Sequence, residues 1–522
     1  MDTKILTASQ ADLKLAGRII REGGLVAFPT ETVYGLGANA LDENAVRRIY
    51  EAKGRPSDNP LIVHIARKED FAPLVESIND KAQALIDAFF PGPLTIILKK
   101  SERINNTVSG GLDTVAVRMP ENETARAVIE AAGCPVAAPS ANTSGLPSPT
   151  KAKYVIDDMN GKVDAIVDGG DCEFGVESTV ITLAGDKPVI LRPGAVTKEM
   201  LESVIGEVEV AQAVTEGMAE NEKAQSPGMK YKHYSPRARV VIVNADKEDY
   251  EAFVNSRKKA FALCFEGDNV NCPKVCFGRE RDDLSQAREL FDALRKLDEM
   301  GATKVYARIP SKTGVGMAVY NRLIRAAAFQ VIDLKKPFTI GLTGQTGAGK
   351  SYVCERLEKQ GFKILDCDKY VRELYENNTG LREILRAEFG DNIIENGRID
   401  RRALADAAFA DRESTDRLNS IVHPFVVSAC EADAKGLCVL DAPQLFEAKM
   451  QDKCYKIISV IAPQEIRLKR ITERDGISCE QAKQRMSAQH SEEFFRAHSD
   501  FVIINDGRDI DKQIENITEE IL

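Results

Sequence analysis

Residues 344–351 read GQTGAGKS and match the phosphate-binding pattern G-x-x-x-x-G-K-[ST]. An apolar run at residues 338–342 precedes this loop, and a helical pattern at residues 351–360 follows it. This order lets backbone N–H groups and a helix N-terminus surround a phosphate. We expect Lys350 on the β- and γ-phosphates and Ser351 on Mg²⁺. The predicted nucleotide-binding residues are Gly344, Thr346, Gly347, Ala348, Gly349, Lys350, Ser351 and Tyr352.

Acidic residues follow two further apolar runs in this region. Residues 363–365 lead into Asp366 and Asp368, and residues 437–440 lead into Asp441. Ligands bind at the carboxyl edge of a parallel sheet, so we expect these carboxylates near the loop, with Asp441 on the magnesium side. Three later arginines share one helical face, which fits either a lid over phosphates or a solvated surface. They are Arg467, Arg470 and Arg474.

The composition is that of a globular protein with several domains. The chain has 522 residues, a net charge of −10 and 43% hydrophobic residues, so about three domains are expected. The negative charge argues against a role in coating nucleic acid, and no signal peptide or membrane-spanning run is evident. The eleven scattered cysteines indicate reduced thiols and a cytoplasmic location. For Cys264, Cys272 and Cys276, buried thiols are favoured over a zinc site because no histidine accompanies them.

Residues 1–205 repeatedly place polar residues beside Pro or Gly at the ends of apolar runs. The segments are TETVYG from residue 30, KGRPSDNP from 53, AVRMP from 116, PSANTSG from 139, ESTV from 177 and LRPG from 191. Their cations are Lys53, Arg55, Arg118 and Arg192, and no Ser-His-Asp order or metal-ligand cluster accompanies them. Such loops suit a polyanion such as ATP together with a small carboxylate. The alternative is that each arginine is a solvated surface charge.

This set of segments resembles the threonylcarbamoyl-AMP synthase family, which has the YrdC-like α/β fold. The resemblance covers residues 1–205 and implies that L-threonine, bicarbonate and ATP are joined into threonylcarbamoyl-adenylate, with release of pyrophosphate. The product serves the modification of tRNA beside the anticodon, so tRNA and tRNA-modification proteins are candidate partners. In this chemistry the substrate supplies the nucleophile, and the enzyme supplies positioning and positive charge.

The resemblance also assigns residues to the two substrates. Lys53 and Arg55 would be catalytic, and Arg118 would grip the carboxylate of threonine. The predicted threonine-binding residues are Thr32, His64, Arg118 and Ser178. The predicted ATP-binding residues are Lys53, Arg55, Asn59, Thr114, Ser140, Asn142, Ser148, Arg192 and Tyr234.

The middle of the chain begins with an acidic, loop-like linker at residues 206–225. The basic, aromatic segment 226–237, SPGMKYKHYSPR, resembles the part of longer synthases that crosses the active site, and it would bring Tyr234 against the nucleotide. A plain ordered linker is the alternative. Residues 238–335 alternate strands and helices, predict a small open α/β sheet and resemble the C-terminal domain of longer synthases. We expect a regulatory or closing role for this domain.

The last region, residues 336–522, resembles dephospho-coenzyme A kinase through LTGQTGAGKS, LDCDKYVREL, IVHP, DAPQLFE, RLKRITERDG and FVIIND. The resemblance implies transfer of the γ-phosphoryl group of ATP to the ribose 3′-hydroxyl of dephospho-CoA. Asp368 would be the catalytic base, Lys350 would hold ATP, and the three arginines would form the lid. His423, Pro424 and Arg401 would line the acceptor side. Gln345 and Gln444 depart from the family pattern, in which glycine and leucine are usual, and Gln444 puts acceptor affinity in doubt.

The sequence therefore predicts an α/β multidomain, bifunctional enzyme with Mg²⁺-ATP as co-substrate at both sites and no membrane segment. The predicted parts are the synthase domain 1–205, the crossing linker 206–237, the small α/β domain 238–335 and the phosphate-loop kinase domain 336–522. Three alternatives remain: a carbamoyltransferase or an RNA-binding module in the first half, and a regulatory nucleotide-binding domain in the last.

Overall fold

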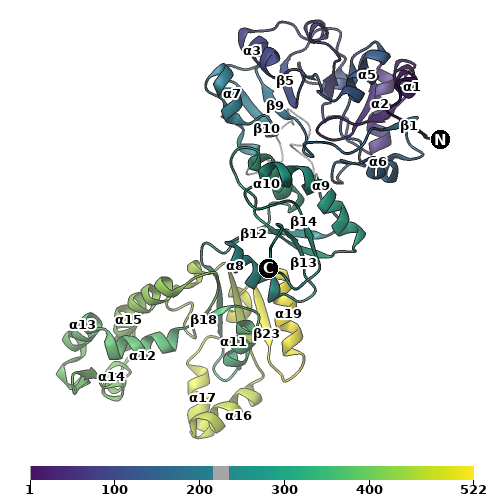
Figure 1. Cartoon of the computed structure of the whole chain (residues 1–522). Coiled ribbons are helices and arrows are strands. Elements are labelled where there is room, and N and C mark those ends of the chain that lie inside the picture. Colours follow the sequence, from purple (N-terminus) through teal and green to yellow (C-terminus); the bar gives the residue numbers. More distant parts are fainter. Residues whose placement is uncertain (1, 215–233) are drawn as a thin grey trace. The chain divides into compact units, whose positions relative to one another are not determined.

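A computed structural model describes residues 2–214 and 234–522 (Figure 1). Its contacts divide into two compact units. Unit 1 comprises residues 1–243 and 258–331, and unit 2 comprises residues 244–257 and 332–522. Most of the segment predicted as a small middle domain thus packs with the first region, while its residues 244–257 pack with the last. The bounds of the four predicted parts stay predictions.

The main sheet of unit 1 is mixed, and its strand order is β1-β8-β2-β3-β7-β4-β6-β5-β9-β10-β11. The strands are β1 Lys4–Thr7, β2 Val26–Phe28, β3 Gly35–Asn39, β4 Ile62–His64, β5 Leu94–Lys99, β6 Thr114–Arg118, β7 Val136–Ala137, β8 Ala165–Asp168, β9 Thr179–Thr182, β10 Val189–Arg192 and β11 Glu209–Val210. β4 and β6 are parallel, and their register sets His64 opposite Arg118. Two predicted site residues therefore meet where these strands end.

Helices cover this sheet through apolar faces. They are α1 Gln10–Arg21, α2 Glu43–Lys53, α3 Asp80–Phe89, α4 Asn106–Ser109, α5 Glu123–Ala132, α6 Ala152–Met159 and α7 Lys198–Ile205, with short 3₁₀ turns at Lys68–Asp70, Ala72–Leu74 and Gln212–Val214. Ser9 caps α1, because its hydroxyl accepts from the Asp12 N–H at 3.3 Å. The Asp12 carboxylate instead accepts from Thr7, so it does not complete the reciprocal pair.

The start of the predicted linker is more ordered than expected. β11 pairs in parallel with β10, and the turn Gln212–Val214 follows it. The prediction of loop from residue 206 onward is therefore wrong for these few residues. A strand of two residues is too short to show an alternation of apolar and polar residues in the sequence. It forms here because its backbone pairs with the neighbouring strand β10. The predicted crossing at residues 226–233 lies outside the described residues.

Unit 1 contains a second, parallel sheet with the order β14-β13-β15-β12. Its strands are β12 Arg239–Asn244, β13 Phe261–Cys264, β14 Lys274–Cys276 and β15 Lys304–Arg308, and its helices are α9 Asp283–Glu299 and α10 Gly316–Ala326. Both helices bury apolar stripes against this sheet. The predicted small α/β architecture is confirmed. Cys264 is buried and Cys272 and Cys276 are half-buried, and no metal-binding group of acidic, cysteine or histidine side chains occurs among the described residues.

Unit 2 is built on a parallel sheet with the order β18-β21-β17-β22-β23. The strands are β17 Phe338–Gly344, β18 Lys363–Asp366, β21 Leu437–Asp441, β22 Lys456–Ile461 and β23 Phe501–Ile504, and β16 Val331–Asp333 precedes them along the chain. The helices are α8 Lys247–Asn255, α11 Lys350–Glu358, α12 Cys367–Asn377, α13 Thr379–Phe389, α14 Arg401–Ala408, α15 Arg412–Asp433, α16 Gln464–Asp475, α17 Cys479–Ser487, α18 Glu492–His498 and α19 Ile510–Ile521. Every strand predicted in this region is present, and the phosphate loop joins β17 to α11 as predicted.

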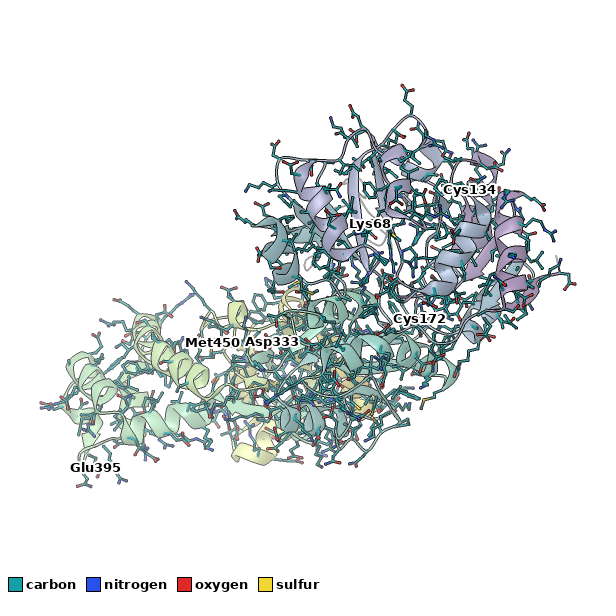
Figure 2. The ribbon with its side chains drawn as sticks, turned by 45° about the horizontal axis from the view of Figure 1, so that its top comes forward. Lys68, Cys134, Cys172, Asp333, Glu395 and Met450 are labelled. Atoms are coloured by element: carbon teal, nitrogen blue, oxygen red, sulfur yellow. The ribbon has the colours of Figure 1, made fainter. Side chains whose placement is uncertain are left out.

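Within unit 2, helices α12 to α15 form a group that extends beyond the sheet (Figure 1). The hairpin of β19 Ile394–Glu395 and β20 Arg398–Ile399 belongs to this group, and Figure 2 shows Glu395 at its outer tip. Helices α16 and α17 contact each other and lie below α11 in the view of Figure 1. None of the helices in the described parts of the chain combines the length and apolar character that a membrane crossing needs.

Candidate active sites

The loops singled out in the sequence of unit 1 converge on one pocket. Nine predicted site residues line it: Lys53, Arg55, His64, Arg118, Ser140, Asn142, Ser148, Arg192 and Tyr234. Backbone and apolar groups such as Val33, Gly35 and Ile62 complete the wall. The four predicted cations are therefore gathered in one place and are not dispersed over the surface.

Lys53 ends α2 and ties that helix to the loop 140–148. Its buried Nζ donates to the carbonyl oxygens of Ser140 and Asn142, both at 2.5 Å. Burial holds the pKa of Lys53 well below its usual value. Arg55 donates to the Pro60 carbonyl at 3.2 Å, and burial lowers its pKa to about 10. The buried Nε of Arg55 has no hydrogen-bond partner.

Arg118 is paired inside the protein with a carboxylate that the sequence analysis did not single out. Its Nη2 lies 2.5 Å from Glu31 Oε1, and its Nη1 donates to Thr32 Oγ1 at 2.9 Å. Burial alone would raise the pKa of Glu31, but the charge and hydrogen bond of Arg118 outweigh it and hold that pKa below the usual value. The buried Nε of Arg118 has no partner.

A second carboxylate, Glu177, lines the pocket itself. Its Oε1 accepts from the Ser148 hydroxyl at 2.6 Å. Beside it, Arg192 donates from Nε to the Ser178 carbonyl at 3.0 Å and from Nη2 to the Ser178 hydroxyl at 3.1 Å. The pocket therefore contains a carboxylate as well as the four cations that the sequence analysis named. Glu31 directly precedes Thr32, and Glu177 directly precedes Ser178. This adjacency to predicted threonine-binding residues was the sequence signal that could have identified both carboxylates.

Four predicted residues do not line the pocket. Thr32 and Ser178 lie behind Arg118 and Arg192 as their hydrogen-bond partners. Asn59 is buried with an unpartnered Oδ1. Thr114 begins β6 whereas Arg118 ends it, so the two lie about 13 Å apart along the strand. Tyr234, in contrast, lies in the pocket wall with its ring 5.2 Å from that of Phe291.

His64 gives a pH prediction. Burial, reinforced by Arg118, lowers its pKa to about 3, and its Nδ1 lies 3.2 Å from the Ile62 carbonyl. The unfolded chain takes up this proton near pH 6.5, so stability is lost as the pH falls below that value. Between about pH 7.5 and pH 5, unit 1 should lose about 2 kcal/mol that a His64→Gln variant does not lose. Scanning calorimetry of parent, His64→Gln and the exposed control His490→Gln measures it, and equal losses in all three would contradict it.

In unit 2 the phosphate loop requires glycine at two positions. Gly344 has φ +138°, and a Cβ there would meet the Val460 backbone at 2.1 Å. Gly349 has φ +97°, and a Cβ there would meet Asn505 Nδ2 at 2.4 Å. Gln345, the departure from the family pattern, is buried, and its backbone N–H donates to the Val460 carbonyl at 3.1 Å. Its side-chain Oε1 is buried without a hydrogen-bond partner.

Three acidic residues lie at the carboxyl edge of this sheet, as predicted. Asp366 and Asp441 are paired in register on β18 and β21. Asp366 caps α12, because its carboxylate accepts from the Lys369 N–H at 2.9 Å. Asp368, in the first turn of α12, is exposed. Burial raises the pKa of Asp441, and its buried Oδ1 has no hydrogen-bond partner.

Two of the three predicted lid arginines contact the phosphate loop. Arg467 Nε donates to the Thr346 carbonyl at 2.9 Å, and Arg470 Nη1 donates to the Gly347 carbonyl at 3.3 Å. Arg474 instead pairs with Asp475 at 2.7 Å. Two residues that the sequence analysis did not assign also reach the loop. They are Gln489, which accepts from the Thr346 N–H at 2.7 Å, and Asn505, which donates to the Ala348 carbonyl at 2.7 Å.

The predicted acceptor-side residues lie on the helical group. His423 is on α15, which continues through Pro424, and its Nε2 lies 3.3 Å from Gln444 Oε1. The unusual glutamine thus contacts a predicted acceptor-side residue directly. Arg401 begins α14 and pairs with Glu376 at 2.9 Å.

Three family models match the chain. One described as "Telomere recombination" matches residues 18–194, "Threonylcarbamoyl-AMP synthase, C-terminal domain" matches residues 196–328, and "Dephospho-CoA kinase" matches residues 338–511. Threonylcarbamoyl-AMP synthase of Pyrococcus abyssi is 47% identical over 62% of this chain and 96% of its own length. Dephospho-CoA kinase of Fusobacterium nucleatum is 36% identical over 35% of this chain and 97% of its own length. The crystal structure of P. abyssi Sua5 complexed with L-threonine aligns with a TM-score of 0.61 and 45% identity, over 63% of this chain and 99% of that one.

The two folds and their sites define an enzyme that uses nucleotides in two separate transfer reactions. The chain belongs to the threonylcarbamoyl-AMP synthase family in its N-terminal part and to the dephospho-CoA kinase family in its C-terminal part, and it is therefore a bifunctional enzyme. Both resemblances and the α/β multidomain fold are confirmed.

Proposed function

We propose that the pocket of unit 1 binds ATP and L-threonine and joins them with bicarbonate into threonylcarbamoyl-AMP, releasing pyrophosphate. The observation that carries this proposal is the gathering of four cationic side chains in one pocket. The threonine amine attacks bicarbonate with loss of water, and the resulting carbamate attacks the α-phosphate of ATP and displaces pyrophosphate. The protein therefore has to position the reactants and stabilise negative charge.

The pocket-lining residues divide between the substrates as follows. Lys53, Arg55 and Arg192 serve the phosphates, and Tyr234 packs against the nucleotide. Ser140, Asn142 and Ser148 belong to the same side. Arg118 and His64 serve threonine, while Thr32 and Ser178 orient the two arginines that they contact. The adenylate would pass to a tRNA-modification enzyme.

Replacing Lys53 by Met tests this site. We expect threonine-dependent pyrophosphate release to fall about 10²- to 10³-fold, since a preorganised cation is lost. ADP formation by the kinase should stay at the parental rate, which reports that the chain is folded. Lys100→Met is the matched control, because Lys100 also donates to two polar groups in unit 1, Asn106 and Ser109, and does not line the pocket. Parental pyrophosphate release by Lys53→Met would place the synthase site elsewhere.

For unit 2 we propose that Lys350 and the loop amides bind ATP and that Asp368 accepts the proton of the acceptor 3′-hydroxyl. Mg²⁺ would be held by Ser351 and Asp441. The residues fit this ion, because Asp441 offers a buried carboxylate oxygen without a hydrogen-bond partner beside the charge of Lys350. When bound, the ion neutralises phosphate charge.

The magnesium ligand can be tested by titration. Asp441→Asn should raise the Mg²⁺ concentration needed for half-maximal kinase activity by at least about tenfold, because an anionic ligand is replaced by a neutral one. Asp433→Asn is the control, since Asp433 lies on α15 and pairs with Lys363. Identical Mg²⁺ dependence of the two variants would remove Asp441 from the proposed site.

A further inference from the structure

Two arginines from the middle of the chain contact groups in the wall of the unit 1 pocket and behind it. Arg295 lies on α9 and Arg322 on α10, in the segment for which the sequence analysis expects a regulatory or closing role. Arg322 is fully buried, with 0% of its surface exposed, and Arg295 is nearly so. A buried guanidinium is retained only when its donors are satisfied, so the groups that it contacts are informative.

Arg322 fixes the pocket carboxylate Glu177. Its Nε lies 3.0 Å from Glu177 Oε2, and its Nη2 donates to the Glu177 carbonyl at 3.1 Å. Nη1 donates to the Pro193 carbonyl. The other carboxylate oxygen of Glu177 accepts from Ser148, so Arg322 sets the position of a pocket-lining hydroxyl through Glu177.

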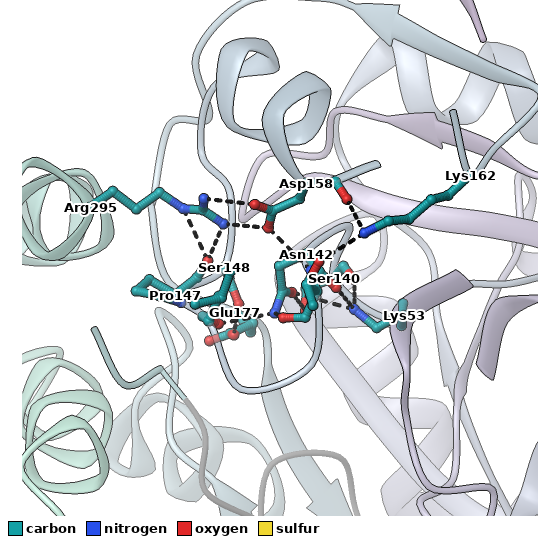
Figure 3. Close-up of polar contacts among 11 residues, drawn as sticks. Lys53, Ser140, Asn142, Pro147, Ser148, Asp158, Lys162, Glu177 and Arg295 are labelled. Atoms are coloured by element: carbon teal, nitrogen blue, oxygen red, sulfur yellow. Dashed lines mark hydrogen bonds and ion pairs between the residues drawn. The ribbon is translucent and has the colours of Figure 1, made fainter. Parts of the chain in front are cut away.

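Arg295 holds the same loop from a second point. Its Nη2 and Nη1 contact the two oxygens of Asp158 at 2.8 Å and 3.2 Å, and Nη2 also donates to the Pro147 carbonyl at 2.6 Å (Figure 3). Asp158 in turn accepts from the Thr143 N–H at 3.1 Å. Figure 3 shows this network on the side of the loop away from Lys53, whose amine holds the other side.

The loop 140–148 has no helix or strand of its own, yet it contributes Ser140, Asn142 and Ser148 to the pocket. Backbone hydrogen bonds from Ala141 to the Tyr34 carbonyl at 2.8 Å and from Ser144 to the Lys53 carbonyl at 2.9 Å hold one part of the loop, and side-chain contacts hold the rest. A displacement of about 1 Å at such a site can reduce the rate about a hundredfold. The charge of Glu177 gives a second reason why the pocket needs Arg322. Glu177 faces a pocket for a polyanion, and Arg322 compensates that charge so that Arg192 and Lys53 remain for the phosphates.

We propose that Arg295 and Arg322 are positioning residues of the synthase, and that the middle segment is a structural part of its active site. This inference rests on the proposed placement of the synthase site in the pocket. On this proposal the middle segment supports substrate binding by holding the pocket residues in position, and its role is not a separate regulatory one.

The test compares Arg295→Gln and Arg322→Gln with Arg308→Gln. Arg308 is a matched control, since it lies on β15, is buried and pairs with Asp268 at 2.6 Å, but does not contact the loop. Pyrophosphate release is measured against ATP and threonine concentration, without dephospho-CoA. We expect KM for ATP to rise about 10- to 100-fold in the first two variants and to stay within about twofold in the control. Kinase turnover should match the parent in all three.

Two further variants keep the outcome decisive. Glu177→Gln/Arg322→Gln removes both charges, so it avoids an unpaired buried carboxylate and should restore the thermal midpoint while KM for ATP stays raised. A parental KM in this double variant, or an equal rise in Arg308→Gln, would overturn the positioning role. Lys53→Met reports on the site itself. If it loses activity while Arg295→Gln and Arg322→Gln keep parental KM values, the inference fails and the proposed site stands.

Discussion

Replacing Asp368 by Asn should slow phosphoryl transfer to dephospho-CoA by at least about a hundredfold while leaving ATP affinity near that of the parent. A positioned general base contributes about 10²–10⁴ in rate, and Asn cannot accept the proton. Lys350 and Ser351 lie in the nucleotide loop, so Lys350→Ala should impair ATP binding as well as turnover. Single-turnover ADP formation and nucleotide binding, measured on the same variants, separate the two effects.

Asp366 is the natural control for this experiment. On sequence alone either aspartate could be the base, with the other capping the next helix. Asp366 carries the cap, through its contact with the Lys369 N–H at 2.9 Å, whereas Asp368 is exposed one residue into α12. Because Asn caps about as well as Asp, Asp366→Asn should keep turnover near the parental value. An inactive Asp366→Asn enzyme beside an active Asp368→Asn enzyme would reverse the assignment.

The elements that could be predicted from sequence are those whose pattern is local. The run Phe338–Gly344 and the loop after it fix β17, the turn and α11 through apolar content and glycine spacing. The carboxyl-edge position of Asp441 follows from the parallel sheet. The sequence could not decide that Asp366 is the N-cap of α12. An N-cap residue has an extended backbone, and the sequence does not fix the exact residue at which β18 ends and α12 begins.

The parts that could not be predicted depend on contacts between distant segments. Arg322 and Glu177 are 145 residues apart, and nothing in either segment specifies the other. The role of Glu31 could not be predicted for a related reason. Its partner Arg118 lies at the end of β6, 87 residues further along the chain, and the two charges meet only in the folded protein. The four cations singled out in the sequence do line one pocket, whereas the two carboxylates that pair with arginines there were not singled out.

Arg118→Ala should abolish threonine-dependent pyrophosphate release and spare the kinase. The substitution breaks a buried pair with Glu31, and removing one partner of such a pair costs about 3–5 kcal/mol. This loss combines two effects, the missing grip on the threonine carboxylate and the unpaired Glu31 carboxylate that is left behind. The single variant tests whether Arg118 matters, and parental threonine-dependent turnover would remove it from the site.

The double variant Glu31→Gln/Arg118→Met separates these two effects. It leaves no unpaired buried charge and keeps the side-chain volumes close to the original, so the thermal midpoint of unit 1 should recover. If Arg118 grips threonine, pyrophosphate release stays low in this variant even though the fold is restored. Threoninamide, which lacks the carboxylate, supplies the matching ligand control. The parent should strongly prefer threonine over threoninamide, and the double variant should use both equally poorly. Recovery of threonine-dependent turnover would instead mean that Arg118 serves only to neutralise Glu31, and that the carboxylate of threonine is bound by another cation of the pocket.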